Sequence, residues 1–504
     1  MTDQETFDWL RSHFCEIALL QSTADALEWD ERTGMPSAAG SYRAEQVTLL
    51  RGMIHQRRIA SRVGESLDAL RQSELVADPS SDQASTIERL HEDYSRDVRL
   101  PQSLVESLAR ATVIGQQAWD AARKADEFAI FRPALETMIR LKRETASHLQ
   151  NEDQSAYDAL LHEFEPEASA DRLRVVFAEL REQLVPLVQE IAAATHQPDV
   201  RLMQRSFPVA DQRCFSRFAA EKIGFDFERG RLDETSHPFC TNLGPDDCRI
   251  LSRYEERWFP GGLFGTLHEA GHGLYEQGLR REWYGLPPGS FCSLGIHESQ
   301  SRLWENLVGR SHAFWRFLFP HARKVFPTAF ADATVDSVHF AVNAVRPSLI
   351  RVEADEATYN LHVIIRFELE QQLIGGELSV DDLPDAWDAA YQATLGVQAP
   401  SAADGVLQDV HWSAGLFGYF PTYTLGNIYA AQLFAAAEKE IGGLEDQFAQ
   451  GSFGELLHWL REHVHHVGRR YRPEELIQQA TGEATHSQAL MASLRNRYEE
   501  LYRL

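Results

Sequence analysis

Two histidines within residues 266–279, TLHEAGHGLYEQGL, have the spacing of metal ligands. His268 and His272 are four positions apart, so on a helix both imidazoles project from one side and can reach the same ion. Glu269 lies one step around the helix from His268, a position that suits a general base rather than a ligand. This H-E-x-x-H arrangement predicts zinc-dependent hydrolysis, with a zinc-activated water as the nucleophile and Glu269 as the base.

A catalytic zinc ion usually takes three protein ligands and leaves one position open, so a third ligand is needed. Glu298, in SLGIHESQSRLWENL, follows the helix-breaking segment GLPPGS and begins another amphipathic helix that can return beside the first. Two alternatives are Glu276, which would lie too far along the same helix, and His297, which suits a contact behind a ligand or with substrate. We therefore predict that His268, His272 and Glu298 bind Zn²⁺.

Two further features of these segments carry expectations. Gly271 and Gly273 lower the helix propensity beside His272, each by up to about 1 kcal/mol relative to Ala, so we expect a neighbouring backbone to pack closely there. A second histidine cluster, His463, His465 and His466, lacks an acidic base and adjoins arginines. That cluster is expected to form a solvated helix face rather than a metal site.

The elements that must position these residues are helical almost throughout. Apolar residues recur on one helix face from Leu173 to Leu184, with Ser169 placed as the N-cap, and the same pattern recurs over residues 135–139 and 361–369. Residues 227–255 are rich in turn formers and end in the alternating run CRILSRY, which predicts a small sheet. We expect an all-α fold with that one exception, and residues 1–504 are treated as a single catalytic unit whose internal division cannot be read from the sequence.

Composition excludes several classes of protein. The 504 residues carry a formal net charge of −26, which disfavours nucleic acid or an anionic membrane as a partner. The acidic start MTDQETFDWL is unlike a signal peptide, and no window supplies the ~20 apolar residues of a membrane span. Five scattered cysteines indicate free thiols in a reducing cytoplasm, and Cys292 is expected to be a buried small apolar residue.

Several separated motifs resemble those of the carboxypeptidase Taq family of metallocarboxypeptidases, over nearly the whole length. This sequence departs from the family's DxRxT motif at one position. Leu251 stands where the family has threonine, whereas Asp247 and Arg249 match. The other matching segments are residues 29–46, HPF at 237–239, the zinc helix at 268–272, HESQ at 297–300, IRxxAD at 350–355, and GxxQDxHW at 405–412.

The resemblance implies a mostly helical fold with a deep active-site groove, zinc or cobalt in the site, and a homodimer. It also implies removal of C-terminal residues from peptides that have a free C-terminus, with broad side-chain tolerance. In this reading Arg351 binds the terminal carboxylate, with Arg249 as the next candidate and His237 as a further substrate contact. His411 or Tyr423 would donate a hydrogen bond to the oxyanion.

Other interpretations stay open at this point. Arg351 could instead form an ion pair with Glu353 or Asp355, and His411 and Tyr423 could be buried structural groups. A zinc endopeptidase or a dipeptide-releasing enzyme could use the same centre. A catalytically silent, metal-stabilised binding protein is disfavoured by the general base Glu269, because a structural zinc needs no base.

Overall fold

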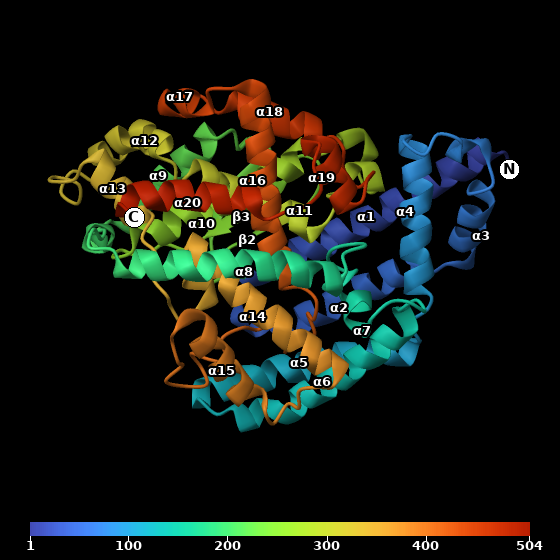
Figure 1. The fold of residues 1–504 in the computed structure, drawn as a ribbon. Coiled ribbons are helices and arrows are strands. Elements are labelled where there is room, and N and C mark those ends of the chain that lie inside the picture. The colour runs from blue at the N-terminus through green and yellow to red at the C-terminus, as the bar shows by residue number, and fades with distance from the viewer. The chain divides into compact units, whose positions relative to one another are not determined.

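Helices make up most of the protein in the computed structural model, which describes residues 1–504 (Figure 1). The chain divides into two compact units, and each unit gathers three separated segments. Unit 1 contains Met1–Asp97, Pro198–Asn343 and Tyr429–Thr485, and unit 2 contains Val98–Gln197, Ala344–Ile428 and His486–Leu504. The all-α prediction with one small sheet is confirmed.

Unit 1 holds the sheet and the larger number of helices. Its helices are α1 (Asp3–Thr33), α2 (Gly40–Arg58), α3 (Ser61–Leu70), α4 (Asp82–Asp97), α9 (Val209–Lys222), α10 (Phe259–Gly278), α11 (Leu294–Arg302), α12 (His312–Val325), α13 (Val335–Val342), α17 (Leu444–Ala449), α18 (Gly454–Leu460) and α19 (Pro473–Thr481). Helix α16 (Pro421–Ile441) begins in the sequence of unit 2 and ends in that of unit 1.

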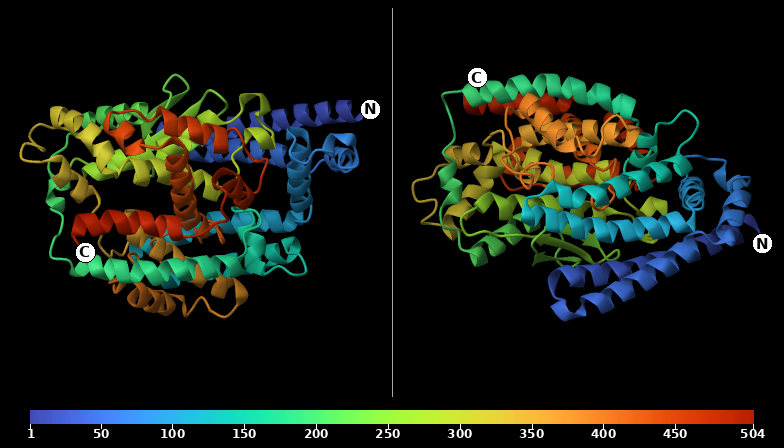
Figure 2. Two further views of the ribbon diagram at one scale, coloured as in Figure 1. Left: turned by 45° about the horizontal axis from the view of Figure 1, so that its top comes forward. Right: turned by 90° about the horizontal axis from the view of Figure 1, so that it is seen from below.

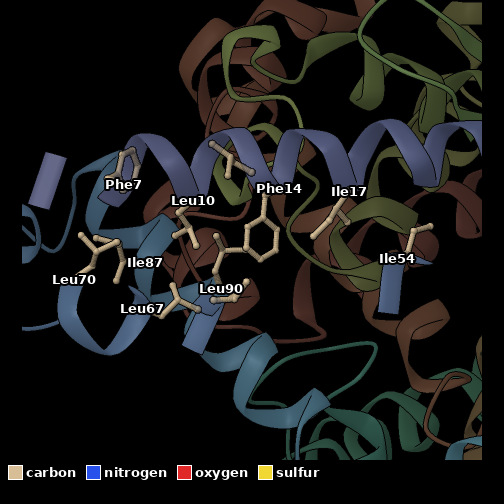
Figure 3. Packing of buried hydrophobic residues seen from close by; sticks show 11 residues of the cluster. Phe7, Leu10, Phe14, Ile17, Ile54, Leu67, Leu70, Ile87 and Leu90 are labelled. Atoms are coloured by element: carbon tan, nitrogen blue, oxygen red, sulfur yellow. The ribbon is translucent and has the colours of Figure 1, made fainter. Parts of the chain in front are cut away.

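The N-terminal helices of unit 1 pack through a regular apolar stripe. Phe7, Leu10, Phe14 and Ile17 recur at helical spacing on α1; the first three point toward leucines and isoleucines of α3 and α4, and Ile17 lies on the side of Ile54 of α2 (Figure 3). Thr2 starts α1 with a capping box, because its hydroxyl accepts from the Glu5 N–H while the Glu5 carboxylate accepts from the Thr2 N–H. Helix α2 runs beside α1 in Figure 2.

A three-stranded sheet lies against α10. It consists of β1 (Gly230–Glu234), β2 (Phe239–Asn242) and β3 (Cys248–Ser252), in the order β1-β3-β2, with β1 parallel and β2 antiparallel to β3. Alternate residues of β3 face α10, since the Ser252 hydroxyl donates to the Gly262 carbonyl and Ile250 lies next to Gly273. The sheet predicted for residues 227–255 is confirmed, and it supports the helix that carries the two histidines.

Unit 2 is built from long helices that pack along their lengths. They are α5 (Gln102–Ala125), α6 (Phe128–Leu149), α7 (Ala156–Leu161), α8 (Ala170–Ala193), α14 (Glu356–Gly375), α15 (Leu383–Leu395) and α20 (Gln488–Tyr502). Helices α5 and α6 lie side by side, as do α8 and α20 (Figure 2). The predicted helical stretches fall within α6, α8 and α14, and Ser169 caps α8 by accepting from the Arg172 N–H.

None of these helices combines the length and the low charge that crossing a membrane would require.

Candidate active site

Helices α10 and α11 bring the three predicted metal ligands together. The imidazole rings of His268 and His272 on α10 are 4.8 Å apart, centroid to centroid. Their Nε2 atoms lie 3.7 Å and 3.5 Å from Oε2 of Glu298, which is on α11. All three side chains therefore present a donor atom to one point in unit 1.

The spacing of these donors fits a zinc ion. Nitrogen and oxygen ligands at about 2.1 Å from a tetrahedral zinc are about 3.4 Å apart, close to the two separations measured here. One donor atom from each residue lies within 4.8 Å of the other two. Two imidazoles and one carboxylate are also the donor types of catalytic zinc sites that keep a position open.

A glycine sets how closely α11 approaches α10. A Cβ atom added to Gly271 would lie 2.6 Å from the Gln300 carbonyl oxygen and 2.6 Å from the Ser301 Cα, so the backbones meet here. The expected close approach is thus present at Gly271, whereas Gly273 faces the side chains of Phe225 and Ile250. Gly271 is one residue before His272 on α10, and Gln300, which it meets, is two residues after Glu298 on α11.

A carboxylate holds the His268 ring from behind. Nδ1 of His268 lies 2.9 Å from Oε2 of Glu305, which sits in a π-helical turn over Leu303–Val308. Although burial opposes ionisation, Arg302 and His268 lower the pKa of Glu305 to about 2. An ionised Glu305 requires a proton on Nδ1 of His268, which leaves Nε2 as the atom able to bind a metal.

His272 is held through a longer relay. Its Nδ1 lies 3.1 Å from the His297 carbonyl oxygen and 2.6 Å from Nδ1 of His297, while Nε2 of His297 lies 2.8 Å from Oε1 of Glu276. Asn242 donates to the other oxygen of Glu276 at 2.6 Å. These contacts require the His272 Nδ1–H to donate toward His297, so Nε2 again faces the centre. Glu276 and His297, the alternative ligands, thus lie behind His272.

Glu269 is buried beside this centre. Burial raises the pKa of Glu269 to about 7, and the Glu298 and Glu305 carboxylates add to the increase against the opposing effect of His268. A carboxyl group whose pKa is near neutral can both accept and return a proton at working pH. The three side chains could therefore hold a metal ion, with a buried group able to exchange a proton next to it.

Arg351 lies in unit 2, where an aspartate other than the expected partners binds it. Its Nε and Nη2 donate to Oδ1 of Asp409 at 3.1 Å and 2.8 Å, and its Nη1 donates to the Tyr359 hydroxyl at 2.9 Å. The alternative of an ion pair with Glu353 or Asp355 is wrong for Asp355, because that carboxylate caps α14. Glu353 lies in the same helical turn as Arg351, but the ion pair that Arg351 forms is with Asp409.

Asp409 belongs to a buried cluster that also contains His411 and Tyr423, the two predicted oxyanion donors. It also accepts from Arg366, and the two guanidinium groups hold its pKa well below the usual range despite burial. Nε2 of His411 lies 3.2 Å from the Tyr423 hydroxyl. Burial and the positive charge of Arg351 lower the pKa of His411 to about 3, so this imidazole is neutral.

The remaining predicted substrate contacts lie in unit 1. Arg249, on β3, donates two hydrogen bonds to Asp247 at 2.8 Å and 2.7 Å and stacks on Trp29. His237 is exposed in the bend between β1 and β2. Leu251, at the position of the family threonine, is fully buried in β3 and pairs with Phe239.

Comparison with known proteins decides the family. Residues 9–498 match the family described as carboxypeptidase Taq (M32) metallopeptidase. The chain is 46% identical to thermostable carboxypeptidase 1 of Thermus thermophilus and 37% identical to carboxypeptidase 1 of Bacillus subtilis, with 99–100% of each chain covered. The crystal structure of an M32 carboxypeptidase from Deinococcus radiodurans superposes with a TM-score of 0.96 at 42% identity, covering 99% of this chain and 100% of that one.

The chain belongs to the carboxypeptidase Taq family. Membership makes it a metallocarboxypeptidase, and His268, His272 and Glu298 form a cluster that could hold its metal ion.

Sequence reasoning missed several residues that support the site of this carboxypeptidase Taq member. Glu305 could have been noticed as a single acidic residue within the apolar run LWENLV. Asp409 lies in the matched GxxQDxHW motif, and nothing in its spacing assigns it a role. The expectation of a solvated face was wrong for His465, which is fully buried and lies 2.9 Å from Gln300 of the HESQ segment. Cys292 is buried, as expected.

Proposed function

We propose that residues 1–504 act as one peptidase unit that removes C-terminal residues from peptides, with broad specificity and a zinc ion bound by His268, His272 and Glu298. One observation carries the proposal. Both histidine Nε2 atoms face Oε2 of Glu298, at 3.7 Å and 3.5 Å, beside the buried Glu269. Zinc, or cobalt in its place, would supply Lewis-acid chemistry that polarises the scissile carbonyl and acidifies a water.

Glu269 serves in this proposal as general base and then as general acid. Its pKa near 7 allows the carboxylate to take the proton of the attacking water and the carboxylic acid to protonate the leaving amine. The same residue can perform both steps because the proton it gains in the first is the one the amine needs in the second. Glu305 and His297 keep the two histidine rings in place, since each holds an Nδ1 atom.

Arg351 is proposed to bind the substrate's terminal carboxylate. Three of its five N–H hydrogens are used by Asp409 and Tyr359, and the other two are one on each Nη atom. These two hydrogens remain for the two oxygens of a substrate carboxylate. Asp409 would thus orient the guanidinium. His411 and Tyr423 are proposed as oxyanion donors, a role worth roughly 3 kcal/mol, and Arg249 and His237 as further substrate contacts.

The test compares peptides with free and amidated C-termini, with products identified by mass spectrometry with and without a zinc chelator. We expect stepwise loss of C-terminal residues from free peptides, poor cleavage of amidated ones, and no cleavage after chelation. Cleavage of amidated peptides at internal bonds would show an endopeptidase. Removal of two residues at a time would show a dipeptide-releasing enzyme instead.

Two sets of variants test the residue assignments. Glu269→Gln should retain zinc by metal analysis and lose nearly all turnover, because the amide cannot accept a proton. Arg351→Lys and Arg351→Ala should narrow the preference for free over amidated peptides, the alanine variant by at least ~10-fold. Arg249→Lys is the matched control, and if it narrows the preference while the Arg351 variants do not, Arg249 binds the carboxylate.

We also propose that the protein forms a homodimer, as the family resemblance implies. We propose that it lies in the cytoplasm, as its free cysteines indicate. Light scattering of the purified protein measures the assembly directly, and a mass equal to one chain would contradict it.

A further inference from the structure

Two cysteines meet on the face of the sheet that packs against α10. Strand pairing places Cys240 of β2 opposite Ile250, and Cys248 lies two residues before Ile250 on β3, so both thiols share one face. Their Sγ atoms are 3.7 Å apart. The Cys248 thiol also donates to the carbonyl oxygen of Gly273, at 3.9 Å, the residue after the predicted ligand His272.

The sulfur separation suits a bridging metal ion. Two thiolates at about 2.3 Å from a tetrahedral zinc are about 3.8 Å apart, so the thiols already have the spacing that such an ion requires. A disulfide has a sulfur separation of about 2.05 Å, so the two thiols are not bonded to each other as they are placed here. The observed sulfur separation therefore fits a shared cation without movement of the sulfurs.

The charges around the pair also favour a cation. The hydrogen bond to Cys248, burial and the negative Glu276 and Glu269 side chains together raise the pKa of the Cys240 thiol well above its ordinary value. A protonated thiol is a poor nucleophile, which argues against a covalent catalytic role. The Glu276 and Glu269 side chains, which raise this pKa less than the hydrogen bond and burial do, would also attract a positive ion.

We propose that Cys240 and Cys248 form a second cation site, which binds one soft, thiophilic metal ion between the two sulfurs. Binding releases both thiol protons to solvent, forms two metal–sulfur bonds and involves no oxidation or reduction. The ion enters from the side of Cys240, which is half-buried, whereas Cys248 is buried. This site is separate from the cluster of His268, His272 and Glu298 and does not depend on which metal that cluster holds.

Occupancy of the site should inhibit the enzyme. The ion removes the proton through which Cys248 donates to Gly273, and it places positive charge near Glu276, the carboxylate that holds His297 behind His272. Both changes act on α10 at the turn that carries His272. The site would thus make activity sensitive to an excess of a thiophilic metal.

The experiment adds cadmium to the purified, zinc-loaded protein under anaerobic conditions. Thiolate–cadmium bonding is followed by its ultraviolet charge-transfer band, zinc content by metal analysis, and accessible thiols by titration with a thiol reagent. Cys240→Ser removes one sulfur without a change of size, and Cys214→Ser, at an exposed cysteine, is the matched control. Thermal unfolding checks that each variant is folded.

Wild type and Cys214→Ser should bind one cadmium ion, show the charge-transfer band and retain their zinc. In both proteins, two thiols should no longer react with the thiol reagent. Their activity should fall at least ~10-fold and return when a dithiol chelator is added. Cys240→Ser should show no band and keep its activity. A band that persists in Cys240→Ser, zinc displaced by cadmium without a band, or two thiols lost to a disulfide would each overturn the proposal.

Discussion

Replacement of Gly271 by alanine tests whether the contact between α10 and α11 sets the position of Glu298. The added Cβ would meet the Gln300 carbonyl oxygen and the Ser301 Cα at 2.6 Å, whereas ordinary contact begins at 3.4 Å. Because both atoms belong to backbone, α11 must move away by about 0.8 Å. Glu298 moves with it, since it is two residues from Gln300 on the same helix.

That displacement is large on the scale of metal coordination. Ligand distances in zinc sites are held within about ±0.2 Å, so a shift of about 0.8 Å weakens or removes the Glu298 bond. We expect zinc affinity to fall by about 10-fold to 100-fold, as measured by competition with a chromophoric chelator. Overpacking should also cost about 1–3 kcal/mol of stability, partly offset by the better helix propensity of alanine.

Gly265→Ala is the matched control because it lies on the same helix and gains the same propensity. Its added Cβ would have the Ser252 hydroxyl oxygen as its nearest neighbour, at 3.4 Å, which is an ordinary contact. We expect wild-type zinc affinity in this variant, with equal or slightly higher stability toward urea. Equal zinc affinity in the two variants would refute the reasoning, since the close approach of α11 would then not fix Glu298.

Three further results follow from buried charges. Glu305→Gln should weaken zinc binding by ~10-fold or more in the same chelator competition, because a neutral amide holds His268 less firmly; wild-type affinity would contradict this. Asp409→Asn should lower the free energy of unfolding by about 3–5 kcal/mol in urea titrations, because it leaves two buried guanidinium groups without their carboxylate. An unchanged free energy of unfolding would show that other partners compensate the charges of the two guanidinium groups. Burial raises the pKa of Glu370 to about 7 from an ordinary 4.5. The stability that protonated Glu370 contributes is therefore fully present below pH 4.5 and is lost as the pH rises through 7. This loss lowers the free energy of unfolding by at most about 3 kcal/mol. The difference in unfolding free energy between pH 5 and pH 8 should therefore be smaller in Glu370→Gln than in wild type, and equal differences would assign the titration to other groups.

Local periodicity in the sequence predicts the part of the candidate site that α10 and α11 bring together. His268 and His272 were readable because four residues make about one helical turn, and Glu298 because helix-breaking residues precede it. The helices around Leu135, Leu173 and Leu361 were readable for the same reason.

Partners that meet only through packing could not be predicted. Asp409 binds Arg351 from 58 positions away, and His465 reaches Gln300 across 165 positions. Nothing in the spacing of these residues indicates the contact, and nearer acidic residues such as Glu353 offered a simpler pairing. The division into two units was equally hidden, because its boundaries fall between segments of ordinary composition.

The interleaved order of the two units has a consequence for synthesis on the ribosome. Unit 2 is completed only by its last segment, whose helix α20 packs on α8 and whose Tyr502 hydroxyl accepts a hydrogen bond from the Val345 N–H. Unit 1 likewise awaits Tyr429–Thr485. Neither core can therefore close before its last segment, within residues 429–504, has been synthesised, and nascent chains expose apolar helix faces until then. We expect C-terminal truncations to aggregate instead of yielding a folded half, and high-level expression to depend on chaperone capacity.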